Sequence, residues 1–271
     1  MSASQRMPVV FFGHGSPMIA LETNDTTRAW AAIAEAIPRP KAILCVSAHW
    51  LTKGVGVTAM DKPRTIHDFG AFPQALFDVQ YPAPGAPDLA ERVRQILAPT
   101  RVILDQQAWG LDHGTWSVLV KAYPKADVPV VQLSMDVDLS PQGHFDLGRR
   151  LAPLRDEGVL IIASGNIVHN LPKMDWSAQN GPAFDWAARF NDAMRTAIAE
   201  DRPDAVVEFA SLGRDASLSV PSPDHFWPLL YILGARAPGE AASFPVDHIE
   251  YGSLSMTSVV IGADPPVARA A

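Results

Sequence analysis

The sequence contains almost no cysteine. Cys45, within AILCVSAHW, is the single cysteine among 271 residues, so no disulfide can form within the chain. Free cysteine is among the most buried residue types. Its apolar neighbourhood therefore predicts that Cys45 is a buried core thiol.

Long hydrophobic runs and runs of basic charge are also missing. No apolar stretch approaches the roughly 18 residues that a membrane-spanning helix needs, and MSASQRMPVV does not have the pattern of a signal peptide. The net charge is −7 without any run of five Lys or Arg residues, which disfavours nucleic acid and anionic membranes as partners. These absences predict a cytoplasmic protein that acts on small molecules. A monomer or a homodimer is expected, and the sequence does not choose between them.

Several catalytic motifs are absent as well. Ser164 lies in IIASGN, where Ile162 occupies the position of the first glycine of a nucleophile elbow. The stretch GHGSPM lacks the third glycine of a dinucleotide fingerprint, and there is no P-loop and no His-Glu-X-X-His helix. Metal chemistry based on histidine remains after these exclusions.

Short apolar runs alternate with helical patterns along the chain. The runs are rich in Val and Ile and do not alternate with polar residues, which is typical of strands buried on both faces. This order predicts an α/β fold with a largely parallel central sheet flanked by helices. The expected strands are 8–13, 42–48, 54–59, 101–104, 128–134, 159–164 and 253–261, and the expected helices are 26–38, 86–99, 140–154 (with Ser140 as N-cap) and 182–201.

Segment 61–85 is long, aromatic and proline-rich, with weak periodicity. A loop of this length in a compact domain is usually functional, so it is expected to form a lid or a pocket wall. No repeat or low-complexity linker interrupts the chain. We therefore expect one catalytic domain over 1–271, with a core at about 8–262 and a frayed tail at 263–271.

Histidines stand where predicted strands end. His14 follows VVFFG, His49 follows AILCVSA, and His169 comes shortly after VLIIASGN. The carboxyl ends of parallel strands share one edge of a sheet, where ligands bind in open α/β folds. His113 in WGLDHGTW and His225 in SPDHFWPLL also lie in turn-like stretches. Each of the five could instead be an ordinary surface or core histidine, and the set as a whole favours a shared site at the strand ends.

Three further histidines have weaker signals. His67 belongs to segment 61–85 and could line a pocket, His144 is expected on the solvated face of a helix, and His248 is expected to be structural. Asp224 is expected to cap the short apolar helix that His225 opens.

Seven motifs in this order resemble the 4,5-DOPA extradiol dioxygenase family. This family belongs to the class III extradiol enzymes, the superfamily of the protocatechuate 4,5-dioxygenase catalytic subunit. The resemblance covers about residues 9–260 and rests on GHGSP, SAHW, IHDFGAFP, GLDHGTW, VPVVQLSM, GVLIIASGNIVHNL and PDHFWPL.

The resemblance implies a non-haem Fe(II) site at the carboxyl ends of the strands. His14, His49 and His225 match the metal ligands. His169 matches an acid/base beside the metal, or a fourth ligand when Zn(II) occupies the site, and His113 matches a second acid/base. Three histidines are also a zinc ligand set, so these ligands alone leave the metal open.

The implied activity is ring cleavage of a catechol by O2. With L-DOPA, 4,5-cleavage would give a seco-DOPA that cyclises to betalamic acid. Two alternatives remain open: a zinc-dependent hydrolase with Asp112 or Asp224 as base, and a non-catalytic binding protein on the same scaffold.

The residues that contact the substrate are less defined in the sequence. Lys62 or Arg64 could bind a side-chain carboxylate. The expected apolar wall, which would shield reactive oxygen from water, comprises Phe69, Phe72, Trp109, Trp116, Phe226 and Trp227, with His67 beside it.

Overall fold

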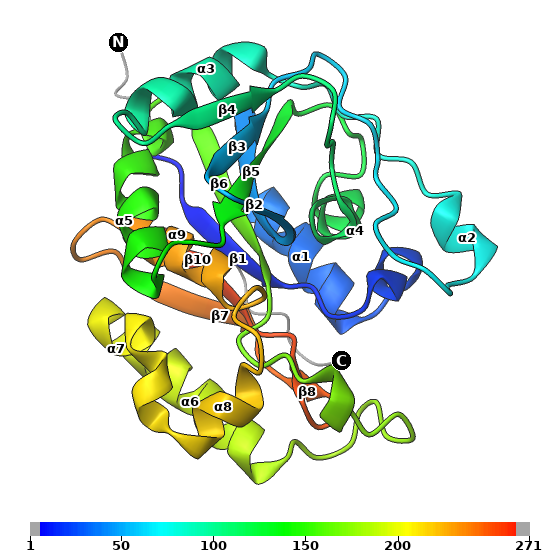
Figure 1. Cartoon of the computed structure of the whole chain (residues 1–271). Coiled ribbons are helices and arrows are strands. Elements are labelled where there is room, and N and C mark those ends of the chain that lie inside the picture. Colours follow the sequence, from blue (N-terminus) through cyan, green and yellow to red (C-terminus); the bar gives the residue numbers. More distant parts are fainter. Residues whose placement is uncertain (1–5, 264–271) are drawn as a thin grey trace.

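The computed structural model describes residues 6–263, and its centre is an eight-stranded sheet (Figure 1). The pairs β3–β4, β2–β5, β2–β6 and β1–β6 are parallel, whereas β3–β5, β1–β10 and β7–β10 are antiparallel. The predicted α/β fold with a largely parallel sheet is confirmed. From edge to edge, the strands are β4 (Val102–Asp105), β3 (Val55–Thr58), β5 (Val130–Asp136), β2 (Ala42–Thr52), β6 (Val159–Gly165), β1 (Val9–Gly13), β10 (Ser258–Ile261) and β7 (Ala242–Val246).

Helices cover both faces of this sheet (Figure 1). The α-helices are α1 (Asp25–Ala36), α2 (Gln74–Phe77), α3 (Pro87–Ile96), α4 (His113–Ala122), α5 (Pro141–Leu151), α6 (Asp185–Ala199), α7 (Pro203–Val207), α8 (Arg214–Ser219) and α9 (Trp227–Ala235). Short 3-10 helices lie at η1 (Pro17–Leu21), η2 (Ala152–Arg155), η3 (Leu171–Lys173) and η4 (Phe209–Leu212).

The two faces of the sheet form two apolar cores. Successive side chains of a strand point to opposite faces, so Phe11 packs on one face with α3, α5 and α9, and Phe12 packs on the other with α1 and α4. Cys45 belongs to the second core, where it is fully buried, as predicted. Burial raises the pKa of its thiol well above the ordinary range, so Cys45 remains protonated at neutral pH.

Local signals explain where several helices begin. Ser140 accepts a hydrogen bond from the backbone N–H of Gly143, and Pro141 occupies the first helical position of α5. Asn24 caps α1 by accepting from the N–H of Thr27, whose hydroxyl accepts in return from the N–H of Asn24. The hydrogen bond from Gly143 to Ser140 confirms that Ser140 is the N-cap of α5, as predicted.

Some boundaries differ from those expected. The strand predicted over 253–261 is two strands, β9 (Leu254–Ser255), which pairs with β8 (Ile249–Glu250), and β10. His113 opens α4 rather than lying in a loop, because Asp112 accepts from the N–H of Thr115 and caps the helix. Segment 61–85 is irregular apart from α2, which lies at the outer edge of the molecule (Figure 1). The expected tail lies outside the described residues beyond Ala263.

The expectation that His144 lies on a solvated helix face is wrong. Its side chain is fully buried where α5 meets α9, its Nδ1 lies 3.0 Å from the hydroxyl of Tyr231, and its ring packs against Trp227. α9 (WPLLYILGA) is buried along its length, and an all-apolar helix must be covered by its neighbours. The face of α5 that carries His144 supplies part of that cover.

The buried His144 predicts that the protein loses stability in mild acid. Burial lowers the pKa of His144 to about 4, although Asp136 opposes the shift. Because an unfolded chain binds the proton near pH 6.5, unfolding becomes more favourable as pH falls from about 6.5 to about 4, by up to about 3 kcal/mol for this group. We expect His144→Gln to flatten the pH dependence of the unfolding free energy in urea titrations, and an unchanged slope in the variant would contradict this assignment.

Within residues 6–263, no helix combines the length and apolar character that crossing a membrane requires.

Candidate metal centre

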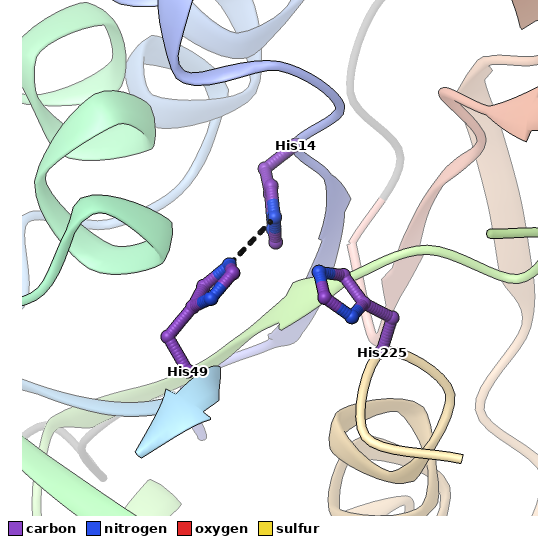
Figure 2. A group of neighbouring side chains, drawn as sticks. All are labelled: His14, His49 and His225. Carbon is purple, nitrogen blue, oxygen red and sulfur yellow. Dashed lines mark hydrogen bonds between the residues drawn. The ribbon is translucent and has the colours of Figure 1, made fainter. Parts of the chain in front are cut away.

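Three histidines from distant parts of the chain meet at the carboxyl edge of the sheet (Figure 2). His14 directly follows β1, and His49 lies in β2 beyond the last residue that pairs with β6. β6 lies between these strands and is parallel to both. His225 stands just before α9, and its carbonyl accepts from the N–H of Asn166 at the end of β6. The expected convergence of these residues is therefore present in the structure.

The imidazole rings point toward a common centre. One ring nitrogen from each of His14, His49 and His225 lies within 4.8 Å of the others. The Nε2 atoms of His14 and His49 are 3.2 Å apart (Figure 2). A spacing this close is what a single cation bound by several imidazoles requires.

Hydrogen bonds fix the tautomer of His14. Its Nδ1 lies 2.9 Å from Oγ of Ser164, and that hydroxyl donates to the carbonyl of Gly114 at 2.5 Å. Because the serine proton is already used, Ser164 accepts from Nδ1–H of His14. The lone pair of His14 is thereby left on Nε2, the nitrogen that faces the other two rings, as is usual when a neighbour orients a metal-binding histidine.

Asp224 fixes the tautomer of His225. Its Oδ2 forms a short contact with Nδ1 of His225. Burial opposes ionisation of this carboxyl, but the bond from His225 and its charge bring the pKa of Asp224 well below the ordinary range. Asp224 is therefore ionised and holds the proton of His225 on Nδ1. The expectation that Asp224 caps α9 is wrong, because α9 begins after Phe226 without any side-chain cap.

His14 and His49 are held neutral. Burial lowers the pKa of both rings well below the usual value for histidine, and the neighbouring histidines lower it further. A ring that stays neutral keeps a lone pair for a metal. Buried, neutral and convergent imidazoles are a donor set that suits iron, zinc, copper or nickel, so the residues fit the metal that the sequence implies.

Close packing sets the position of His49. A Cβ on Gly114 would stand 2.5 Å from Oγ of Ser47 and 2.8 Å from Cδ2 of His49. Only glycine allows α4 to approach β2 this closely. Ser47 in turn donates to the buried carboxylate of Asp112, so the start of α4 and the end of β2 are joined beneath the site.

His113 and His169 flank the three rings. The ring of His169 stacks on that of His225, with centroids 3.5 Å apart and planes 4° from parallel. The ring centroids of His113 and His49 are 3.8 Å apart. Burial and the proximity of His225 lower the pKa of His169 to about 3. His169 is thus neutral at physiological pH, which is the state in which an imidazole can accept a proton.

A cavity of about 240 Å³ opens over the five histidines. Phe69 and Phe72, from segment 61–85, form part of its wall, and no carboxylate appears among the described residues that line it. Its other wall residues are Gly15, Ser16, Pro17, Leu171, Met174, Trp176 and Leu254. The site is therefore a largely apolar chamber with its nitrogen donors at the base.

Other residues expected at the pocket lie elsewhere. His67 contacts the carbonyl of Val79 through Nε2, and Trp109 stacks on Trp50 at 5.7 Å. Trp227 packs on His144, as described above. Trp116 and Phe226 are buried in the two cores, and the guanidinium of Arg64 donates to the carbonyl of Ala108. None of these six residues contributes to the described lining of the cavity.

Two residues in contact with the site were not foreseen from the sequence. Ser164 sits in a fully buried strand, and Asp68 belongs to an irregular segment. Their roles depend on partners far along the chain, 150 residues from Ser164 to His14 and 45 from Asp68 to His113. The only local signal was the polar residue in an otherwise apolar strand.

The comparisons with known proteins agree with this geometry. The family described as "Catalytic LigB subunit of aromatic ring-opening dioxygenase" matches residues 10–262. The chain is 51% identical over 263 residues to "4,5-DOPA dioxygenase extradiol" of Escherichia coli (strain K12), covering 96% of both proteins. It is 37% identical to the Beta vulgaris protein of the same name, covering 92% of this chain and 96% of that protein.

A solved structure shares the fold. The crystal structure of an uncharacterized protein from Escherichia coli K12 matches with a TM-score of 0.83 and 46% identity, covering 95% of this chain and 100% of that one. The resemblance seen in the sequence is confirmed by these matches. The chain belongs to the aromatic ring-opening dioxygenases of the LigB family and is an extradiol ring-cleaving enzyme.

Proposed function

We propose that this enzyme cleaves L-DOPA, or a related phenylpropanoid catechol, at the 4,5 position, with Fe(II) held by His14, His49 and His225. The observation that carries the proposal is the convergence of three imidazoles below an apolar cavity. Relatives named "4,5-DOPA dioxygenase extradiol" align with 92–96% of the chain in the two pairs above and support the choice of substrate.

Iron(II) bound at this site would bring catecholate and O2 together and pass electron density between them. Three neutral histidines leave the full charge of the cation uncompensated, and a deprotonated catechol would supply the missing negative charge. Ser164 and Asp224 keep the lone pairs of His14 and His225 directed at the cation.

His113 and His169 are proposed to move the protons. Both line the cavity beside the metal ligands. His169 stacks on His225 and faces the cavity, so its ring is placed to accept a hydroxyl proton as the catechol binds and to return one during ring opening. The donor atoms that converge are those of His14, His49 and His225, which supports an acid/base role for His169.

The cavity suits an aromatic ring. Phe69 and Phe72 stand edge to face at 5.2 Å in its wall, and both can pack against a catechol. Leu171, Met174 and Trp176 complete a second wall. The side chain of Trp176 is highly exposed, which places it where the cavity meets solvent and where the propanoid side chain of the substrate would emerge.

The zinc hydrolase alternative is less well supported. Such enzymes rely on a metal-bound water, usually with a carboxylate nearby as base. Asp224 is engaged with His225, and Asp112 is buried among Ser47, Gln132 and the N–H of Thr115. Neither carboxylate lines the cavity, so neither is placed to activate a water there.

Oxygen consumption tests the proposed function. Metal-free protein is loaded anaerobically with Fe(II) or with Zn(II) and mixed with L-DOPA, caffeate or protocatechuate in an oxygen electrode. We expect one O2 consumed per ring and a yellow product from L-DOPA with the Fe(II) form only. Ester or amide hydrolysis by the Zn(II) form, without O2 uptake by the Fe(II) form on any catechol, would contradict the proposal.

A further inference from the structure

The carboxylate of Asp68 reaches from segment 61–85 to the start of α4. Its Oδ1 accepts the backbone N–H of His113 at 2.9 Å, and its Oδ2 lies 3.0 Å from Nδ1 of the same residue. The Asp68 side chain is only 14% exposed. One carboxylate therefore holds both the backbone and the ring of a proposed proton-transfer residue.

The surroundings leave few other partners for this ring nitrogen. Nδ1 of His113 is buried and makes no well-aligned hydrogen bond in the part of the chain that the structure describes. The ring is otherwise enclosed by Phe69, whose centroid is 5.4 Å away, and by His49. A buried ring N–H without an acceptor is costly, and Oδ2 of Asp68 is the anionic acceptor within reach.

We infer that Asp68 is a positioning residue that fixes the tautomer of His113. A carboxylate beside Nδ1 keeps the ring proton on Nδ1 and leaves the lone pair on Nε2, at the opposite side of the ring. His113 lines the cavity and Asp68 does not. The nitrogen that can accept a proton is thereby kept for the substrate. This inference rests on the proposed role of His113 in proton transfer.

The same contact gives segment 61–85 a part in the reaction. Asp68 precedes Phe69, which lines the cavity. A shift of this segment would therefore move an aromatic wall and the acceptor of His113 together. Within the segment, Nε2 of His67 lies 3.0 Å from the carbonyl oxygen of Val79, so the residue next to Asp68 has a contact of its own.

A different reading of these atoms is a second metal. Asp68, His49 and His113 also have donor atoms within 4.8 Å of one another. A cation bound between Oδ2 of Asp68 and Nδ1 of His113, which are 3.0 Å apart, would need that Nδ1 deprotonated, the reverse of the tautomer inferred here. The two readings therefore make opposite statements about one nitrogen, and the experiment below separates them.

Asp68→Asn tests the inference because it preserves shape and reverses hydrogen-bonding character. Its Oδ1 can still accept the N–H of His113, which turns the amide NH2 toward Nδ1. An amide donor at this position favours the tautomer with the proton on Nε2. The readout is the ¹⁵N spectrum of the histidine rings in zinc-loaded protein, since Zn(II) is diamagnetic, with His113 assigned from the spectrum of His113→Gln.

We expect protonated Nδ1 on His113 in the wild type and protonated Nε2 in Asp68→Asn. In the Fe(II) form we expect kcat to fall by about 100-fold or more, the scale of a lost general base, with KM and iron content unchanged. Asp78→Asn removes an exposed carboxylate of the same segment, which accepts from Gln74, and serves as the matched control with wild-type turnover. In a His113→Ala background, Asp68→Asn should cause no further loss.

Three results would overturn the inference. The first is an unprotonated Nδ1 on His113 in the wild type. The second is that Asp68→Asn lowers kcat equally in the wild-type and His113→Ala backgrounds, and the third is that the wild type binds a second equivalent of metal that Asp68→Asn does not bind. Misfolding of the variant leaves the wild-type spectrum as a decisive test. If wild-type enzyme consumes no O2 with any catechol, the proposed function fails, while the ring spectrum still reports separately on Asp68.

Discussion

We expect His49→Ala to abolish metal binding and ring cleavage. Its ring supplies one of the three convergent nitrogens. The ring is only partly buried, and its Nδ1 lies 3.9 Å from Oδ2 of Asp68, so its removal is expected to leave the fold intact. Losing a partner that merely orients a ligand costs about 10–100-fold in metal affinity. We expect the loss of the ligand itself to exceed 100-fold, measured as iron retained after dialysis.

The matched control is His248→Ala. His248 is exposed and lies outside the cavity, so this variant should keep its iron and its turnover. Unfolding curves of both variants should stay close to that of the wild type. Iron content near one per chain in folded His49→Ala would remove His49 from the ligand set.

His169→Ala is expected to keep the metal and lose most of the turnover. His169 stacks on His225 and lines the cavity, but the group of converging donor atoms consists of other residues. Removing a general acid or base typically costs 10²–10⁴-fold in rate. We expect kcat for L-DOPA to fall within this range, while iron content and the anaerobic affinity for catechol change little.

The result also separates an enzyme from a binding protein on the same fold. A site that only binds a catechol has no use for an unligated histidine beside the metal. Unchanged O2 consumption by His169→Ala would exclude this residue from proton transfer. A loss of iron equal to that of His49→Ala would instead make His169 a ligand.

The sheet and the gathering of histidines at its carboxyl edge could be predicted from local patterns in the sequence, whereas the choice of His14, His49 and His225 as the ligand set came from the family resemblance. Apolar runs without alternation marked strands buried on two faces, and parallel strands end at one edge. Residues that follow such runs, as His14 does after β1, are brought together by topology alone. Placing these residues at one edge of the sheet required no knowledge of side-chain packing.

Residues that act through distant contacts could not be predicted in this way. Ser164 reads as an ordinary core serine until His14 is placed beside it, and Asp68 gains meaning only once α4 lies against segment 61–85. His144 was misassigned because the pattern of α5 does not show what covers it. A Cβ on Gly148 would lie 2.3 Å from the carbonyl oxygen of Tyr231, so α9 is too close to leave that face to solvent.

The aromatic residues show the same limit. Phe69 and Phe72 line the cavity, whereas Trp109 stacks on Trp50 and Trp227 packs against His144. Aromatic side chains near a motif serve the core as readily as a pocket. Their direction is set by tertiary packing, which the motif does not encode.

Anomalous diffraction at the iron edge, from crystals loaded with Fe(II) under anaerobic conditions, tests the central claim most directly. We predict a single strong peak for an iron ion within bonding distance of one nitrogen each from His14, His49 and His225. His113 and His169 should lie near this ion without binding it. A peak bonded elsewhere, or to fewer than these three side chains, would contradict the account.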